Sequence, residues 1–343
     1  MSVSAPEAIA DRPPLRRLVQ PVAIALAFVL LALLLRSQWD ALKSLDWHIR
    51  LRWLALSGAC IVGGWLVEVA LWRRLVTILG GRLRYVRAVQ FWFASAIVRY
   101  IPGNVWQPLS LAARCRAEGV RAETTLASLT LFHVIQILAV VPIAAVYLVT
   151  PGATGALTAW TQTLSPWWTL PLAVPIIVFV LWPHTLIRLA NALLGLVGRD
   201  PLPLDLTTTE LVMLLGISLA GWLLFASGFT ALALGFLPEG DVLRSWLPHL
   251  MAAYPVAFAI GFISLITPSG LAVREGALFV LLSPIVGSAY AVVIALGMRV
   301  WEIVLDAVVA TIAVLSLTKT KLTRSGRGRP SGRPNSNATA PLA

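Results

Sequence analysis

The chain has 343 residues, of which 58% are hydrophobic and only 12% are charged, with a formal net charge of +12 and a mean hydropathy of +0.84. A soluble protein keeps about a quarter of its residues charged, and each charge inside a membrane costs a few kcal/mol. The depletion of charge therefore indicates a membrane protein. The basic residues lie between apolar runs, where they serve as topology signals and contact lipid head groups, so the positive charge does not indicate a nucleic-acid partner.

Six apolar runs predict membrane-spanning helices, because a helix needs about 20 mostly apolar residues to cross the bilayer. Segment 1–17 precedes them as a cytoplasmic N-terminus, and residues 18–317 form the predicted membrane domain. Residues 318–343 are rich in Pro, Gly, Ser and Arg, which predicts a disordered basic cytoplasmic tail. In chain order the runs are Leu18–Leu35, Trp53–Trp72, Leu126–Thr150, Trp167–Trp182, Leu211–Leu237 and Ala289–Leu317.

Two further apolar stretches are interrupted in the middle. Ala88–Leu111 is interrupted at Tyr100–Asn104, and Leu250–Leu282 is interrupted at Thr267–Gly270. Proline removes a helical hydrogen bond and glycine adds backbone freedom. Irregular backbone at membrane depth is tolerated only inside protein or against a water-filled cavity. We therefore expect two broken, re-entrant helical hairpins.

The distribution of basic residues predicts the topology. With the N-terminus inside, nineteen Lys and Arg residues lie in cytoplasmic segments and five in outer segments, which is a clear positive-inside bias. Each half then holds three full spans and one hairpin, so the halves, about 18–150 and 167–317, have opposite orientations. The predicted fold is an all-α polytopic membrane protein with an inverted repeat and both termini inside. Inverted repeats with broken helices occur in many transporters, and also in membrane proteins that transport nothing.

Ionisable and polar residues near the two interruptions are the candidate substrate-binding residues, because charges inside a membrane are costly and often functional. Internal ion pairing is the structural alternative, above all for Arg299 with Glu302, which are three residues apart on one helix face. Glu68 is the only charge in its apolar run. The full candidate set is Arg99, Tyr100, Pro102, Gly103, Asn104, Trp106, Gln107, Pro268, Gly270, Arg274, Glu275, Arg299, Glu302 and Glu68.

Arginine beside a helix break is suited to holding phosphate. A guanidinium binds phosphate through two parallel hydrogen bonds and stays charged at any working pH. A helix that begins after a break also directs free N–H groups towards an anion. Arg99 and Arg274 could therefore hold a phospholipid head group from opposite sides of the membrane.

Two other patterns predict helix contacts rather than chemistry. Gly221, Gly228 and Gly235 recur every seven residues in a run without charge, which permits close packing against another helix. His133 and Gln136 share a helix face, and we expect them to make hydrogen bonds to neighbouring helices.

The interruptions also carry a family resemblance. Val98–Gln107, with Arg114 and Gly119 after it, resembles the lysylphosphatidylglycerol synthase membrane-region family, also called flippase-like proteins. Pro268–Gly270 and the following Arg274-Glu275 look like the second motif of that family, with Ser269 where glycine is usual. Phe132-His133 occupies a place where an acidic or basic pair is expected. The resemblance covers most of Leu18–Leu317.

This resemblance implies lipid translocation by a stand-alone membrane region, without the aminoacyl-transferase domain of the synthases. The predicted function is a lipid flippase that moves an anionic or polyprenyl-linked lipid across the cytoplasmic (inner) membrane. The alternatives are a membrane-embedded lipid-modifying enzyme or its partner subunit, and a scaffold for envelope assembly. No catalytic or metal-binding motif is found, so we expect no cofactor and no metal. Expected partners are lipid head groups, with a second copy of the chain or a membrane enzyme left open.

Overall fold

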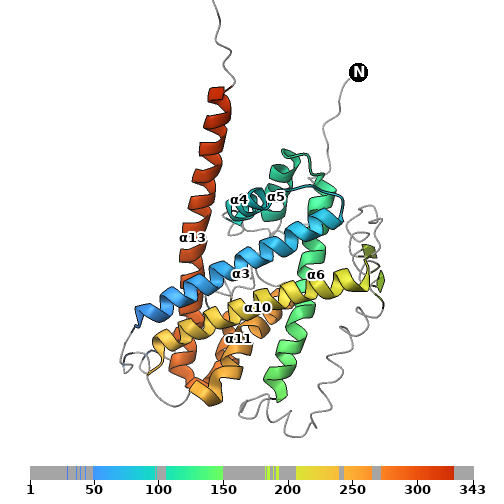
Figure 1. The fold of residues 1–343 in the computed structure, drawn as a ribbon. Coiled ribbons are helices and arrows are strands. Elements are labelled where there is room, and N and C mark those ends of the chain that lie inside the picture. Colours follow the sequence, from blue (N-terminus) through green and yellow to red (C-terminus); the bar gives the residue numbers. More distant parts are fainter. Residues whose placement is uncertain are drawn as a thin grey trace, which may run out of the picture.

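The computed structural model describes residues 49–96, 98, 106–149, 206–238, 243–264 and 272–327, together with a few isolated positions. All the regular elements within these residues are helices, as the sequence predicts (Figure 1). They are α3 (Leu51–Ile78), α4 (Tyr85–Ala96), α5 (Trp106–Arg116), α6 (Ala122–Val149), α10 (Thr208–Phe236), α11 (Leu243–Ser264), α12 (Val273–Val286) and α13 (Ser288–Arg327).

Four of these helices, α3, α6, α10 and α13, are long and apolar enough to cross a membrane. At 1.5 Å per residue, the 28 residues of α3 span about 42 Å, more than the hydrocarbon core of roughly 30 Å. They match four of the six predicted runs to within one residue at the ends where the runs extend beyond them, which confirms a multi-pass α-helical membrane protein. The other two runs, Leu18–Leu35 and Trp167–Trp182, lie outside the described residues apart from isolated positions.

Each interrupted apolar stretch contributes two separate helices. The first is divided between α4 and α5, and the second between α11 and α12. The hydroxyl of Ser110 in α5 donates a hydrogen bond to that of Ser95 in α4 over 3.2 Å, which holds the first pair together. The interrupting residues themselves lie outside the described part of the chain.

Helices α3 and α10 lie side by side and run in opposite directions (Figure 1). Gly221, Gly228 and Gly235 of α10 face α3, which confirms the predicted close packing of this stripe against another helix. A Cβ atom at Gly228 would lie 2.8 Å from Ile61 Cγ1 and 3.1 Å from the Ser57 carbonyl oxygen. At the end of this contact, the Arg50 guanidinium donates to the carbonyl oxygens of Leu234 and Leu237. Small residues thus bring the two backbones close, and a cation satisfies the last carbonyls of α10.

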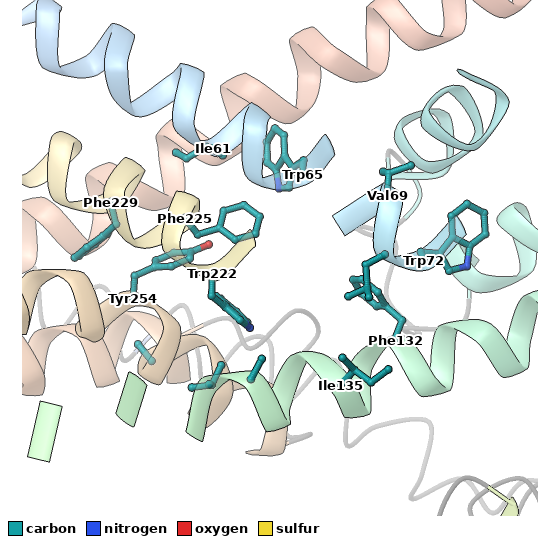
Figure 2. Packing of buried hydrophobic residues seen from close by; sticks show 14 of the residues in the cluster. Ile61, Trp65, Val69, Trp72, Phe132, Ile135, Trp222, Phe225, Phe229 and Tyr254 are labelled. Atoms are coloured by element: carbon teal, nitrogen blue, oxygen red, sulfur yellow. The ribbon is translucent and has the colours of Figure 1, made fainter. Parts of the chain in front are cut away.

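Aromatic side chains fill the space between these two helices and their neighbours (Figure 2). Near one end of α3, Trp72 contacts Trp92, with ring centroids 5.3 Å apart, and its indole N–H donates to the Ser128 hydroxyl over 2.9 Å. Phe225 and Phe229 of α10 contact Tyr254 of α11, and the Tyr254 ring stacks on that of Phe229 with the centroids 5.5 Å apart. Large rings supply much buried area, so this cluster stabilises the bundle and places Tyr254 inside it.

Helix α13 (red in Figure 1) is the longest described helix and continues past the predicted end at Leu317 to Arg327. Its Lys, Arg, Thr and Ser residues beyond Leu317 are compatible with a helix, and Pro330 lies only after its end. Its outer face carries exposed apolar side chains, as expected for contact with lipid. They include Val300, Ile303, Val304, Val308, Ile312 and Leu315.

Candidate charged site between helices α11, α12 and α13

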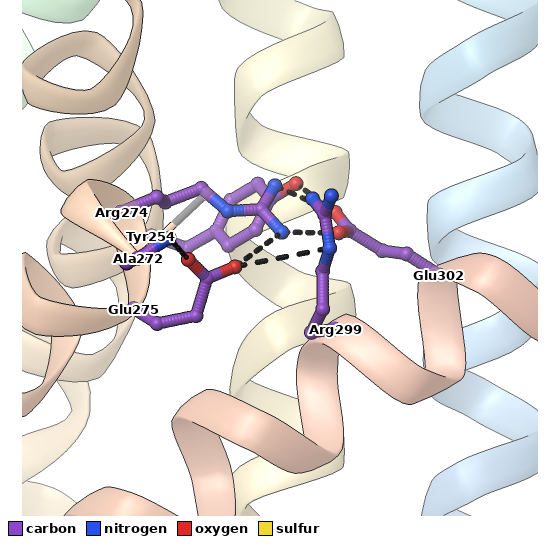
Figure 3. A network of polar contacts seen from close by, with 6 residues as sticks. All are labelled: Tyr254, Ala272, Arg274, Glu275, Arg299 and Glu302. Atoms are coloured by element: carbon purple, nitrogen blue, oxygen red, sulfur yellow. Dashed lines mark hydrogen bonds and ion pairs between the residues drawn. The ribbon is translucent and has the colours of Figure 1, made fainter. Parts of the chain in front are cut away.

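A network of charged side chains lies where α11, α12 and α13 meet (Figure 3). Arg274 and Glu275 stand in the first turn of α12, directly after the interruption of the second apolar stretch. Arg299 and Glu302 project from α13, and Tyr254 projects from α11. The structure thus brings together four predicted site residues from two helices.

The strongest contact in the network joins Arg274 to Glu302. The two terminal nitrogens of Arg274 donate to the two carboxylate oxygens of Glu302 over 3.2 and 2.5 Å. The Tyr254 hydroxyl donates a further hydrogen bond to Glu302 Oε1. The Arg274 guanidinium also lies 5.6 Å from the centroid of the Tyr254 ring. Side-chain exposure is only 6% for Arg274 and 13% for Glu302, so this is a buried, bidentate ion pair.

Glu275 has two different oxygen environments. Its Oε2 accepts a hydrogen bond from the Ala272 backbone N–H over 2.7 Å, which satisfies a free donor at the start of α12. Its Oε1 lies 3.6 Å from Arg274 Nη2 and 3.9 Å from Arg299 Nε, and it accepts no hydrogen bond within the described residues. The positive end of the α12 dipole adds to the stabilisation of this carboxylate.

Local backbone geometry places Arg274 and Glu275 at this junction. Ala272, directly before α12, has φ +67° and ψ −34°, a backbone conformation that residues other than glycine rarely adopt. Gly261 then allows α12 to approach α11, because a Cβ atom there would lie 3.1 Å from Arg274 Cβ. A larger residue at position 261 would move the first turn of α12 away from Tyr254.

Arg299 is held more loosely than Arg274. Its nearest carboxylate oxygen is Glu275 Oε1 at 3.9 Å, and its side chain makes no hydrogen bond within the described residues. Its side-chain exposure is 17%. The ion pair between Arg299 and Glu302, considered from their spacing, does not form because Glu302 is taken by Arg274 across the helix interface.

A second polar cluster joins α3, α6 and α10. Gln136 donates to Glu68 Oε1 over 2.5 Å, and its own side-chain oxygen accepts from the Ser218 hydroxyl. Trp222 donates its indole N–H to the backbone carbonyl of Gln136 over 3.0 Å. The predicted interhelical hydrogen bonding of Gln136 is confirmed, and Glu68 has a partner on another helix.

For His133 the prediction of a hydrogen bond to a neighbouring helix is wrong. Its Nδ1 bonds to the Leu129 carbonyl oxygen in its own helix over 2.7 Å. The His133 ring instead stacks on Phe262 of α11, with the two ring centroids 5.0 Å apart. A ring on a helix can satisfy one nitrogen with the carbonyl four residues back, so it needs no partner elsewhere.

The remaining candidates lie elsewhere or outside the described residues. Trp106 and Gln107 begin α5, with Trp106 48% exposed, and neither makes a hydrogen bond or ion pair with the α11–α13 network.

Tyr254 is not among the site residues predicted from the sequence, although a phenol inside an apolar helix is a signal that could have identified it. Outside the described part of the chain lie Arg99, Tyr100, Pro102, Gly103, Asn104, Pro268 and Gly270.

Within the described residues, no group of three or more His, Cys, Asp and Glu side chains is placed to hold a metal ion. The fold and the site together define a polytopic α-helical membrane protein with a buried network of arginines and carboxylates beside a divided helix. The lysylphosphatidylglycerol synthase TM region family matches residues 20–310, so the chain belongs to that family and is a membrane protein linked to lipid metabolism. No curated protein matches the chain significantly.

Proposed function

We propose that this protein translocates a lipid with a phosphate-bearing head group across the cytoplasmic membrane, and that the α11–α13 network binds that head group. Both an anionic phospholipid and a polyprenyl-linked lipid carry such a phosphate. The observation that carries the proposal is Arg299, a guanidinium inside a membrane bundle that makes no hydrogen bond within the described residues. A charge in this position is costly unless a partner binds it.

The surroundings of Arg299 support phosphate as that partner. Arg274 lies beside the same carboxylate, Glu275, so two guanidinium groups face one region. The fork of a guanidinium matches two phosphate oxygens, and α12 begins at the same place with its positive dipole end. A head group could bind here while its lipid tails remain in the bilayer.

The test is lipid movement in vesicles that contain the purified protein. Phosphatidylglycerol with a fluorescent head-group label would be followed by quenching from outside. We expect Arg299→Gln to lower the protein-dependent rate at least tenfold, on the order of the 1.5–3 kcal/mol of a charged hydrogen bond. Arg299→Lys should rescue poorly, because lysine keeps the charge and loses the fork.

Arg121→Gln is the matched control, since Arg121 is a surface arginine with an 81% exposed side chain. It should translocate lipid at the wild-type rate. Arg299 makes no hydrogen bond within the described residues and its ion pair with Glu275 is 3.9 Å long, so Arg299→Gln should lower the melting temperature far less than Glu302→Ala does. Wild-type rates in Arg299→Gln vesicles, or no movement above protein-free vesicles with the wild type, would refute the proposal.

We further propose the inverted-repeat topology with both termini in the cytoplasm, which the nineteen-to-five charge bias supports. Single cysteines would be introduced in a background without Cys60 and Cys115 and labelled in intact cells with an impermeant maleimide. We expect a cysteine in place of Thr154 to be labelled in intact cells. Cysteines in place of Arg82 and Ser331 should be labelled only after the membrane is opened. Labelling of Ser331 in intact cells would contradict this topology.

A further inference from the structure

The α11–α13 network is electrically balanced. Two guanidinium groups, Arg274 and Arg299, lie within 4 Å of two carboxylates, Glu275 and Glu302. Figure 3 shows the Arg274 guanidinium between the two carboxylates. An anionic head group adds negative charge to this balanced site. Net charge in a low-dielectric interior is unfavourable, so the site needs a compensating change when the anion binds.

The compensating change follows from the hydrogen bonds of Arg274. The two terminal nitrogens of Arg274 already donate to Glu302, so a phosphate that binds this end of the guanidinium displaces that carboxylate. Glu302 then keeps a single donor, the Tyr254 hydroxyl. An ionised carboxylate that loses its buried cation is strongly destabilised, whereas the protonated carboxyl carries no charge.

We propose that this site binds one proton on Glu302 for each phosphate-bearing head group that it binds. The inference rests on the proposed function and adds its coupling ion. The proton comes from water and adds to a carboxylate oxygen of Glu302, and no other bond is made or broken. The bound site is then balanced again: two arginines face Glu275 and the phosphate, while Glu302 is neutral. Lipid movement is thereby linked to proton movement.

Glu302 is the carboxylate that changes most. Glu275 keeps its hydrogen bond from the Ala272 N–H and its contact with Arg299. Glu68, whose charge also acts on Tyr254, keeps its hydrogen bond from Gln136 in the α3–α6–α10 cluster. The helices around Glu302 carry further ionisable side chains within the described residues. They are Arg274 and Glu275 on α12, Tyr254 and the buried His249 on α11, Tyr290, Arg299 and the buried Asp306 on α13, Tyr85 and Arg87 on α4, with Arg87 in an ion pair with Glu118, and Glu210 in the N-terminal capping box of α10.

The test counts protons by calorimetry. Short-chain dihexanoyl phosphatidylglycerol would be titrated into the full-length protein in maltoside detergent, in PIPES and in Tris. These buffers differ in ionisation enthalpy, and the phosphodiester keeps one charge between about pH 6 and about pH 8. We expect uptake of about one proton per lipid, with affinity falling about tenfold for each unit of increasing pH.

The variant Glu302→Gln tests whether the proton taken up on lipid binding is bound by Glu302 or by another group. The amide still accepts hydrogen bonds from Tyr254 and Arg274 but carries no charge, so the variant should bind the lipid at least as tightly and take up no proton. Glu123→Gln, which removes a 58% exposed carboxylate outside the network, should bind and take up a proton like the wild type.

The outcomes are distinguishable. Lipid binding by the wild type without proton uptake overturns the coupling and leaves the proposed function in place. Proton uptake that persists in Glu302→Gln overturns the assignment to Glu302. Absence of lipid binding by the wild type overturns the proposed function together with the coupling.

Discussion

Glu302→Ala is expected to lower the free energy of unfolding by about 3–5 kcal/mol, because it leaves the Arg274 guanidinium buried without its carboxylate. Arg274 is 6% exposed, and both of its hydrogen bonds within the described residues go to Glu302. The variant also removes the acceptor of the Tyr254 hydroxyl. Unfolding in mixed detergent micelles would measure the change.

The double variant Arg274→Met/Glu302→Leu should recover most of this loss. A buried ion pair that is replaced as a whole by apolar side chains of similar size is often neutral for stability, since no charge is stranded. The same double variant should not translocate lipid, because the fork of Arg274 is gone. A double variant as unstable as Glu302→Ala would contradict the ion-pair explanation. A stable double variant that translocates normally would show that the pair serves structure alone.

Gly228→Val is expected to destabilise the protein by about 1–3 kcal/mol through overpacking between α10 and α3. The first added carbon already lies 2.8 Å from Ile61 Cγ1 and 3.1 Å from the Ser57 carbonyl oxygen. Ile61 can rotate slightly, but the backbone oxygen of Ser57 can move only with α3. The melting temperature in detergent should therefore fall clearly.

Gly216→Val is the matched control in the same helix. A Cβ atom at Gly216 would meet no atom within 4 Å, so this change should leave the melting temperature nearly unchanged. If both variants lowered the melting temperature equally, valine would act through its low helix propensity. Close packing at Gly228 would then not be the cause.

The α3–α10 contact and the charged network show where sequence reasoning succeeds and where it ends. The spacing of Gly221, Gly228 and Gly235 predicts one smooth helix face, because helical residues seven apart project in nearly the same direction. The partner helix could not be predicted, since any neighbour could use such a face. In the same way, the three-residue spacing suggested an ion pair between Glu302 and Arg299 on one helix. The structure instead pairs Glu302 with Arg274 on α12.

The sequence alone determined that this is a helical, multi-pass membrane protein with two apolar stretches that break near arginines, because hydropathy, proline, glycine and charge act locally along the chain. Only the tertiary structure decided which charges meet. Interhelical contacts depend on how each helix is rotated and how closely it approaches its neighbour. Here Gly261 sets the approach of α12 to α11, and that approach places Tyr254, Arg274 and Glu302 together.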